Sequence, residues 1–170
     1  MKIFALAGMV EGHLWLLPII PLAGLVAWAL IDEEWESPLG ARIALGASVA
    51  SAFAWWIAFS ALATLPQDER AFLLRIPFWN RGGATHVLLF RLDTLSATWG
   101  VTLSVLALLL QCFALGRDEP LGAVASITGS LTGTSLLLLM GGYGGVLLVW
   151  ALLSPLAYFW PGTPRPDTRD

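Results

Sequence analysis

A long uncharged run that directly follows an aspartate is the feature that most constrains this fold. Residues 94–115 are 22 consecutive residues without a charged side chain. A helix of that length is about 33 Å long, enough to cross the hydrocarbon layer of about 30 Å. Asp93 is a good N-cap, because its carboxylate can accept hydrogen bonds from the free N–H groups of the first turn. The sequence therefore predicts a membrane-spanning helix that starts at Asp93.

The composition agrees with a membrane protein. Hydrophobic residues make up 57% of the chain and charged residues 12%, about half the charge of a soluble domain. The net charge of −3 provides no basic patch for nucleic acid. The single cysteine, Cys112, lies within the uncharged run, so no intrachain disulfide forms and we interpret it as an apolar filler.

Four other apolar stretches predict further spans, at residues 14–31, 43–65, 121–140 and 145–160. The last is marginal, because its 16 residues make about 24 Å of helix and Pro155 interrupts it. Residues 1–13 form an apolar lead-in without a convincing cleavage site, and residues 161–170 form a polar, proline-rich tail. We expect an all-α polytopic membrane protein with about five transmembrane helices in a single domain, residues 14–160.

Small and polar residues in the spans indicate close helix packing. Gly129 and Gly133 form a GxxxG pair in the span 121–140, and Ala44, Ser48 and other small residues repeat at helical spacing in the span 43–65. Trp55 and Trp56 lie in mid-span, where packing against protein is favoured over anchoring at an interface. The most polar residues of the span 94–115 are expected to hydrogen-bond to other helices: Thr98, Thr102, Ser104 and Gln111.

Residues 71–92, between the second and third spans, predict a surface β-hairpin. Two extended segments, Ala71–Trp79 and Ala84–Leu92, flank Asn80, Arg81, Gly82 and Gly83, which favour a tight turn. Both segments are apolar at nearly every position except Arg75 and Arg91, so the hairpin is expected to lie on lipid headgroups or on another subunit. The alternative is an amphipathic interfacial helix, which Pro77 disfavours.

The order of these parts resembles the N-terminal third of the antiporter-like, proton-translocating subunits: subunit L of bacterial NADH-quinone oxidoreductase (complex I) and the large subunit of Mrp-type cation/proton antiporters. A Leu-Pro-rich first span (residues 16–22), a second span and a hairpin precede Phe90-Arg91-Leu92-Asp93-Thr94-Leu95-Ser96. In that family an Asp-x-Leu-Ser segment, matched here from Asp93 to Ser96, starts the third span. The resemblance implies a multi-pass protein of the bacterial inner (cytoplasmic) membrane.

The resemblance also marks a departure in the fifth span. The family has a Trp-Glu pair there, followed by Leu and Ser-Tyr, and its Glu lies on the proton path. In this chain Trp150, Leu156 and Tyr158 match, whereas Ala151 replaces that Glu and Ala157 replaces the Ser. Proton transfer through a bilayer needs titratable groups or water at depth, and the predicted spans contain no ionisable residue of that kind. The chain is not expected to move protons by itself.

The sequence thus predicts a non-catalytic membrane subunit of a larger ion- or proton-translocating complex, redox-driven or of antiporter type. Its partners would be other integral membrane subunits and the lipid bilayer. The residues assigned to packing and structure are Asp93, Ser96, Gly129, Gly133, Trp150, Pro155 and Tyr158. We expect no catalytic residue, no cofactor and no metal, since His13 and His86 lie at a span boundary and on the hairpin. The alternatives are a small homo-oligomeric transporter or channel, and a membrane assembly factor.

Overall fold

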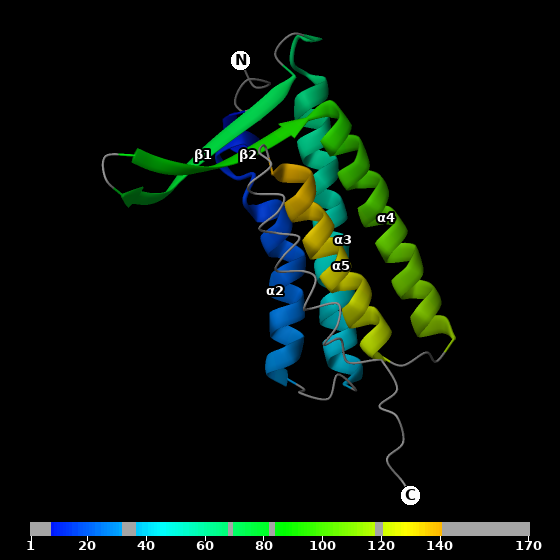
Figure 1. Cartoon of the computed structure of the whole chain (residues 1–170). Coiled ribbons are helices and arrows are strands. Elements are labelled where there is room, and N and C mark those ends of the chain that lie inside the picture. Colours follow the sequence, from blue (N-terminus) through cyan, green and yellow to red (C-terminus); the bar gives the residue numbers. More distant parts are fainter. Residues whose placement is uncertain (1–7, 32–36, 68–69, 82–83, 118–120, 141–170) are drawn as a thin grey trace, which may run out of the picture.

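The computed structural model describes residues 8–31, 37–67, 70–81, 84–117 and 121–140, and in this part of the chain a helical bundle carries a β-hairpin. The hairpin crosses the bundle near one end and projects beyond it (Figure 1). In chain order the elements are α2 (Leu16–Ile31), α3 (Pro38–Ala63), β1 (Ala71–Arg81), β2 (Ala84–Asp93), α4 (Thr94–Gly116) and α5 (Leu121–Leu139). Residues 8–12 add a short helical segment before α2.

Among the described residues, three helices are long and apolar enough to cross a membrane: α3, α4 and α5. The helix α2 is more apolar than these three but has only 16 residues, which corresponds to about 24 Å. The predicted fifth span, residues 145–160, and the predicted tail, residues 161–170, lie outside the described residues. The predicted combination of apolar helices with a hairpin between the second and third of them is confirmed.

The described helices differ from the predicted spans by one to five residues at several ends, and capping chemistry explains the largest difference. The helix α3 begins at Pro38, five residues before the predicted position 43, because Ser37 caps it and Pro38 suits the first turn. The backbone N–H of Gly40 donates to Ser37 Oγ over 3.4 Å. Arg42, which precedes the predicted span, lies at an exposed position within this helix. The helix α2 starts at Leu16 instead of residue 14, after a turn at residues 13–15.

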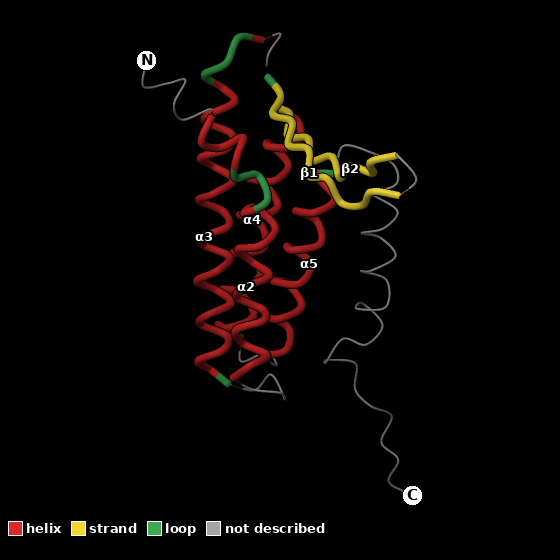
Figure 2. Tube along the Cα trace, turned by 90° about the vertical axis from the view of Figure 1, so that its left-hand side faces the viewer, coloured by secondary structure: helices red, strands yellow, loops and turns green. Residues whose placement is uncertain are grey.

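The helices pack through buried residues that recur in steps of three and four. On α3 these are Ala41, Ala44, Ser48, Ser51, Trp55, Ala58 and Leu62, and on α4 they are Ala97, Gly100, Ser104, Ala107, Gln111 and Ala114. On α2 and just before it they are Leu14, Leu17, Pro21, Gly24 and Trp28. A 3-4 repeat is the spacing of left-handed, coiled-coil-like bundles. Figure 2 shows the four helices lying side by side along most of their length.

Two tryptophans fill sockets that glycines on the facing helix leave open. A Cβ atom added to Gly100 on α4 would fall inside the indole of Trp55 on α3. A Cβ added to Gly40 would likewise overlap the indole of Trp28 on α2. Both indoles are fully buried. The prediction of protein packing is confirmed for Trp55. The next residue, Trp56, points away from the bundle and is 57% exposed, so its packing against protein stays a prediction.

The hairpin lies on the bundle with one of its two faces. Phe72, Leu74, Phe90 and Leu92 point inward and pack near Trp55, Leu62 and Leu139, whereas Leu73, Arg75 and Arg91 are exposed. The register pairs Phe72 with Leu92 and Leu74 with Phe90, and a bulge interrupts it between Pro77 and Trp79. Met140, after the end of α5, forms a bridge with Phe90. Part of the support that we expected from lipid or another subunit therefore comes from the chain's own helices.

The Trp55 socket gives a direct test of this packing. Gly100→Ala should destabilise the protein by about 1–3 kcal/mol, because the added methyl group overpacks the contact with Trp55. The matched control is Gly46→Ala on α3, where nothing lies within 4 Å of the new Cβ; it should be neutral or slightly stabilising. Thermal unfolding of the detergent-solubilised variants measures both effects. Equal melting temperatures for the two variants would contradict the socket.

Candidate functional site

The centre of the bundle contains a layer of polar side chains from three helices. Gln111 on α4 donates from Nε2 to Ser48 Oγ on α3 and to Thr128 Oγ1 on α5, each over 2.9 Å. All three residues are fully buried. The Thr128 hydroxyl in turn donates to the carbonyl oxygen of Val124 over 2.9 Å, so it accepts the bond from Gln111. We call these three residues the Gln111 layer.

A second cross-helix bond lies seven residues further along α3 and α5. Trp55 Nε1 donates to Ser135 Oγ over 3.3 Å, and both residues are buried. Seven residues are about two helical turns, or 10 Å. The Gln111 layer and this indole–hydroxyl pair therefore connect α3 to α5 at two depths.

Other hydroxyls in the bundle bond within their own helix. Ser104 donates to Gly100 O over 2.7 Å, Thr98 to Thr94 O over 2.7 Å, and Thr102 to Thr98 O over 2.9 Å. The prediction that these three residues hydrogen-bond to other helices is wrong, because each one donates to a carbonyl of its own helix. The carbonyl four residues back lies within reach of a Ser or Thr side chain. Of the four candidates on this span, Gln111 alone has cross-helix hydrogen bonds in the described structure, because its longer side chain reaches beyond its own helix.

This interior has the chemistry of a packing core. The buried polar side chains of the described residues are Ser48, Ser51, Ser104, Gln111, Thr128, Thr132 and Ser135. Hydroxyl and carboxamide groups donate and accept hydrogen bonds without gaining or losing a charge near neutral pH. They are suited to fixing the register of helices in a membrane, where each such bond contributes about 0.6 kcal/mol on average.

Asp93 occupies the junction between the hairpin and α4. It is the N-cap of α4, and its Oδ1 accepts from the backbone N–H of Ser96 over 2.8 Å. Its other carboxylate oxygen lies 3.6 Å from Arg91 Nε, and the two side chains are 32% and 56% exposed. An ion pair this exposed contributes little, so the cap is the main role of Asp93, as the sequence predicts.

Some of the remaining predicted site residues lie among the described residues and others lie outside them. Gly133 is buried and Gly129 half-buried on α5, and their role in close helix packing stays a prediction. Trp150, Ala151, Pro155 and Tyr158 lie outside the described residues. His13 is exposed and its Nδ1 lies 2.7 Å from Met9 O. His86 is paired with Trp79 in the hairpin register, and no group of three potential metal ligands occurs among the described residues.

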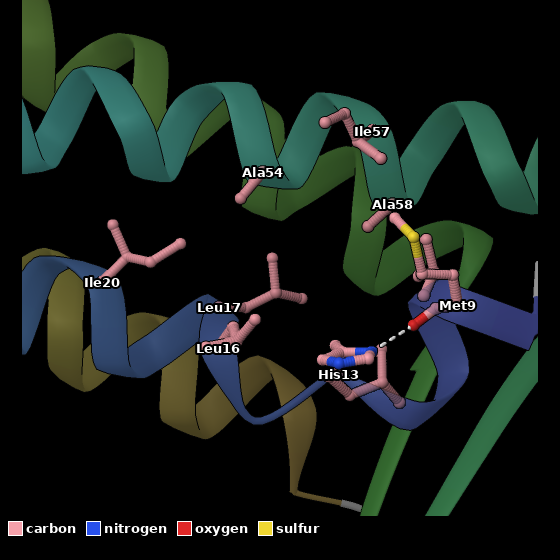
Figure 3. A pocket seen from close by; sticks show the side chains of 10 residues that line it. Met9, His13, Leu16, Leu17, Ile20, Ala54, Ile57 and Ala58 are labelled. Atoms are coloured by element: carbon pink, nitrogen blue, oxygen red, sulfur yellow. Dashed lines mark hydrogen bonds between the residues drawn. The ribbon is translucent and has the colours of Figure 1, made fainter. Parts of the chain in front are cut away.

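A groove of about 220 Å³ runs between α3 and the segment that leads into α2. Figure 3 shows Leu17 and Ile20 on one side of it and Ala54 and Ile57 on the other. His13 lies at one end, with its ring bonded to the chain's own backbone (Figure 3). The lining is almost wholly apolar, which is the character of a lipid-facing seam between two helices, and we assign it no catalytic chemistry.

Comparison of the chain with protein-family models found no matching family, and comparison with curated proteins found no match. The resemblance to antiporter-like subunits therefore rests on the motifs described above, and it enters the next section as part of a proposal.

The cap at Asp93 can be tested with two substitutions. Asp93→Ala should destabilise the protein by about 1 kcal/mol, because the Ser96 N–H loses its acceptor at the start of α4. Asp93→Asn should retain most of the stability, because asparagine is an equally good N-cap. This substitution removes only the negative charge that faces Arg91. Thermal unfolding of the two variants separates the roles. A loss of similar size in both would assign the effect to the ion pair instead.

Proposed function

We propose that this chain is a non-catalytic integral membrane subunit of a larger ion- or proton-translocating complex, where it contributes helices and a hairpin to the assembly. The proposal includes the resemblance to a truncated antiporter-like subunit and a location in the bacterial cytoplasmic membrane. The observation that carries it is that the described residues form a neutral bundle interior: the Gln111 layer and the Trp55–Ser135 bond join helices through uncharged groups. Such an interior supports a structural role better than a proton path, which uses ionisable groups.

The outer surface supports the same proposal. On α3 an exposed apolar stripe comprises Val49, Phe53 and Trp56, and on α4 another comprises Leu106, Leu109 and Phe113. Each stripe follows the 3-4 spacing of one helix face. Large apolar side chains at such positions pack against lipid or against the helices of a neighbouring membrane protein.

Isolation of the assembly tests the proposal. Membranes that contain the tagged chain are solubilised in mild detergent, separated on a native gel, and the band that holds the chain is analysed by mass spectrometry. We expect it to migrate far above its own 18.3 kDa, together with antiporter-like or complex I-like membrane subunits. Migration of the chain alone would contradict the proposal.

Flux measurements test the passive role separately. The purified chain in liposomes should give no more proton flux under an imposed pH gradient than protein-free liposomes do, because the buried polar groups of the described residues are neutral. Flux above that background would contradict the proposal and favour the homo-oligomeric transporter.

Photo-crosslinking can identify the helix face that meets a partner. A photoreactive residue in place of Phe53 or Leu109, which are 65% and 64% exposed, should crosslink to another subunit from at least one of the two positions. The same residue in place of Ala58, which is buried, should crosslink within the chain only and serves as the control. Crosslinks to lipid alone from both exposed positions would argue against an interface on either stripe.

A further inference from the structure

Two buried oxygen atoms near the Gln111 layer have no hydrogen-bond partner among the described residues. They are Oε1 of Gln111 on α4 and Oγ of Ser51 on α3, and both residues are fully buried. Buried polar atoms in folded proteins almost always have a partner, and an ordered water molecule takes that place where no protein group does. Each of these two atoms therefore calls for a hydrogen-bond partner, and their positions on packed helices allow them to share one.

The helix directions place these two atoms at similar depth. Ser51 follows Ser48 by three residues, about 4.5 Å along α3 toward the hairpin end of the bundle. The helix α4 runs in the opposite direction, with its N-terminus at the hairpin end (Figure 1). A helical side chain leans toward the N-terminus of its own helix, so the Gln111 carboxamide leans toward the depth of Ser51. Because Nε2 is bonded to Ser48 and Thr128, Oε1 is the carboxamide atom left for another donor.

We propose that this interior binds one water molecule, which bridges Gln111 Oε1 and Ser51 Oγ. The water molecule donates one hydrogen bond to Gln111 Oε1. It forms a second hydrogen bond with the Ser51 hydroxyl group. The hydroxyl hydrogen of Ser48 supplies a third bond, because the Ser48 oxygen accepts from Gln111 Nε2 and so keeps its own hydrogen available. Three partners are the usual number for a buried water.

The chemistry of the site selects water over a cation. Its four side chains, those of Ser48, Ser51, Gln111 and Thr128, are all neutral, and both hydrogens of Nε2 point at hydroxyl oxygens. A buried cation needs a nearly complete shell of oxygen ligands and a compensating charge. Two free oxygen atoms and the hydroxyl of Ser48 fit a neutral molecule that both donates and accepts.

The direction in which Ser51→Ala changes the melting temperature tests this bridge. If Ser51 Oγ were simply unpaired, Ser51→Ala would remove a buried group without a partner and raise the melting temperature. With the bridging water, Ser51→Ala should lower it by about 2–4 °C, the shift expected for the loss of roughly one hydrogen bond in a chain of this size. Ser104→Ala is the matched control, because that buried hydroxyl bonds within its own helix; its shift should be smaller. In a Gln111→Met background, which lacks the acceptor, the effect of Ser51→Ala should disappear. A raised melting temperature, or the same fall in both backgrounds, would overturn the proposal.

A spectroscopic measurement identifies the ligand directly. Gln67 and Gln111 are the two glutamines of the chain, so Gln67→Glu leaves Gln111 as the source of the glutamine side-chain amide signal. In the ¹⁵N-glutamine-labelled Gln67→Glu chain in lipid nanodiscs, that signal should show a cross-peak to water that Ser51→Ala abolishes and Ser104→Ala retains. Absence of the cross-peak from the parent chain, or a cross-peak to a serine hydroxyl in its place, would overturn the bridge. A shift of the Gln111 signal when choline replaces Na⁺ would assign a cation and overturn it as well.

Discussion

The close approach of the helices is the constraint on which the rest of this structure depends. In a bilayer the hydrophobic effect does not drive helices together, so packing must come from contact between well-fitting surfaces. Glycine, alanine and serine at the 3-4 positions of α3 and α4 let the backbones come near. The indoles of Trp28 and Trp55 then fill the space that Gly40 and Gly100 leave. Because each indole fits only opposite a glycine, these contacts fix the position of one helix along the other.

The same short distances make the polar contacts possible. A hydroxyl reaches its own helix easily and another helix only when the backbones are close. Gln111 spans this gap to both Ser48 and Thr128 because small residues surround it, and Trp55 combines a packing role with a bond to Ser135. Neutral bonds of this kind add specificity without the cost of burying a charge in hydrocarbon. The core thus joins its helices by shape first and by hydrogen bonds second.

The hairpin and α4 form one continuous piece at the end of the bundle. Asp93 ends β2 and caps α4, so the direction of the strand determines where the helix starts. The inward residues Phe72 and Phe90 continue the bundle core past the end of α5. The outward residues Arg75 and Arg91 remain exposed. A two-stranded sheet is marginal by itself, and here the helices beneath it supply the missing support.

Local chemistry in the sequence was sufficient for the existence and order of the elements. Uncharged runs predicted the apolar helices, the Asn-Arg-Gly-Gly segment predicted the hairpin, and Asp93 predicted the start of α4. Each of these features is local: a cap or turn involves a few neighbouring residues, and an apolar helix is recognised from one continuous uncharged stretch. The start of α3 lies before the predicted position, because Ser37 and Pro38 begin the helix there and the helix includes Arg42 at an exposed position.

Tertiary structure alone decided which of two similar residues contacts a neighbouring helix. Trp55 and Trp56 are neighbours with the same side chain, yet one fills the socket at Gly100 and the other faces outward. Gln111 and Ser104 both lie on the buried face of α4, yet Gln111 alone bonds to other helices in the described structure. These outcomes depend on what the facing helix presents at the same depth. Residues from different helices meet there only after the chain has folded, and no local pattern in the sequence records that meeting.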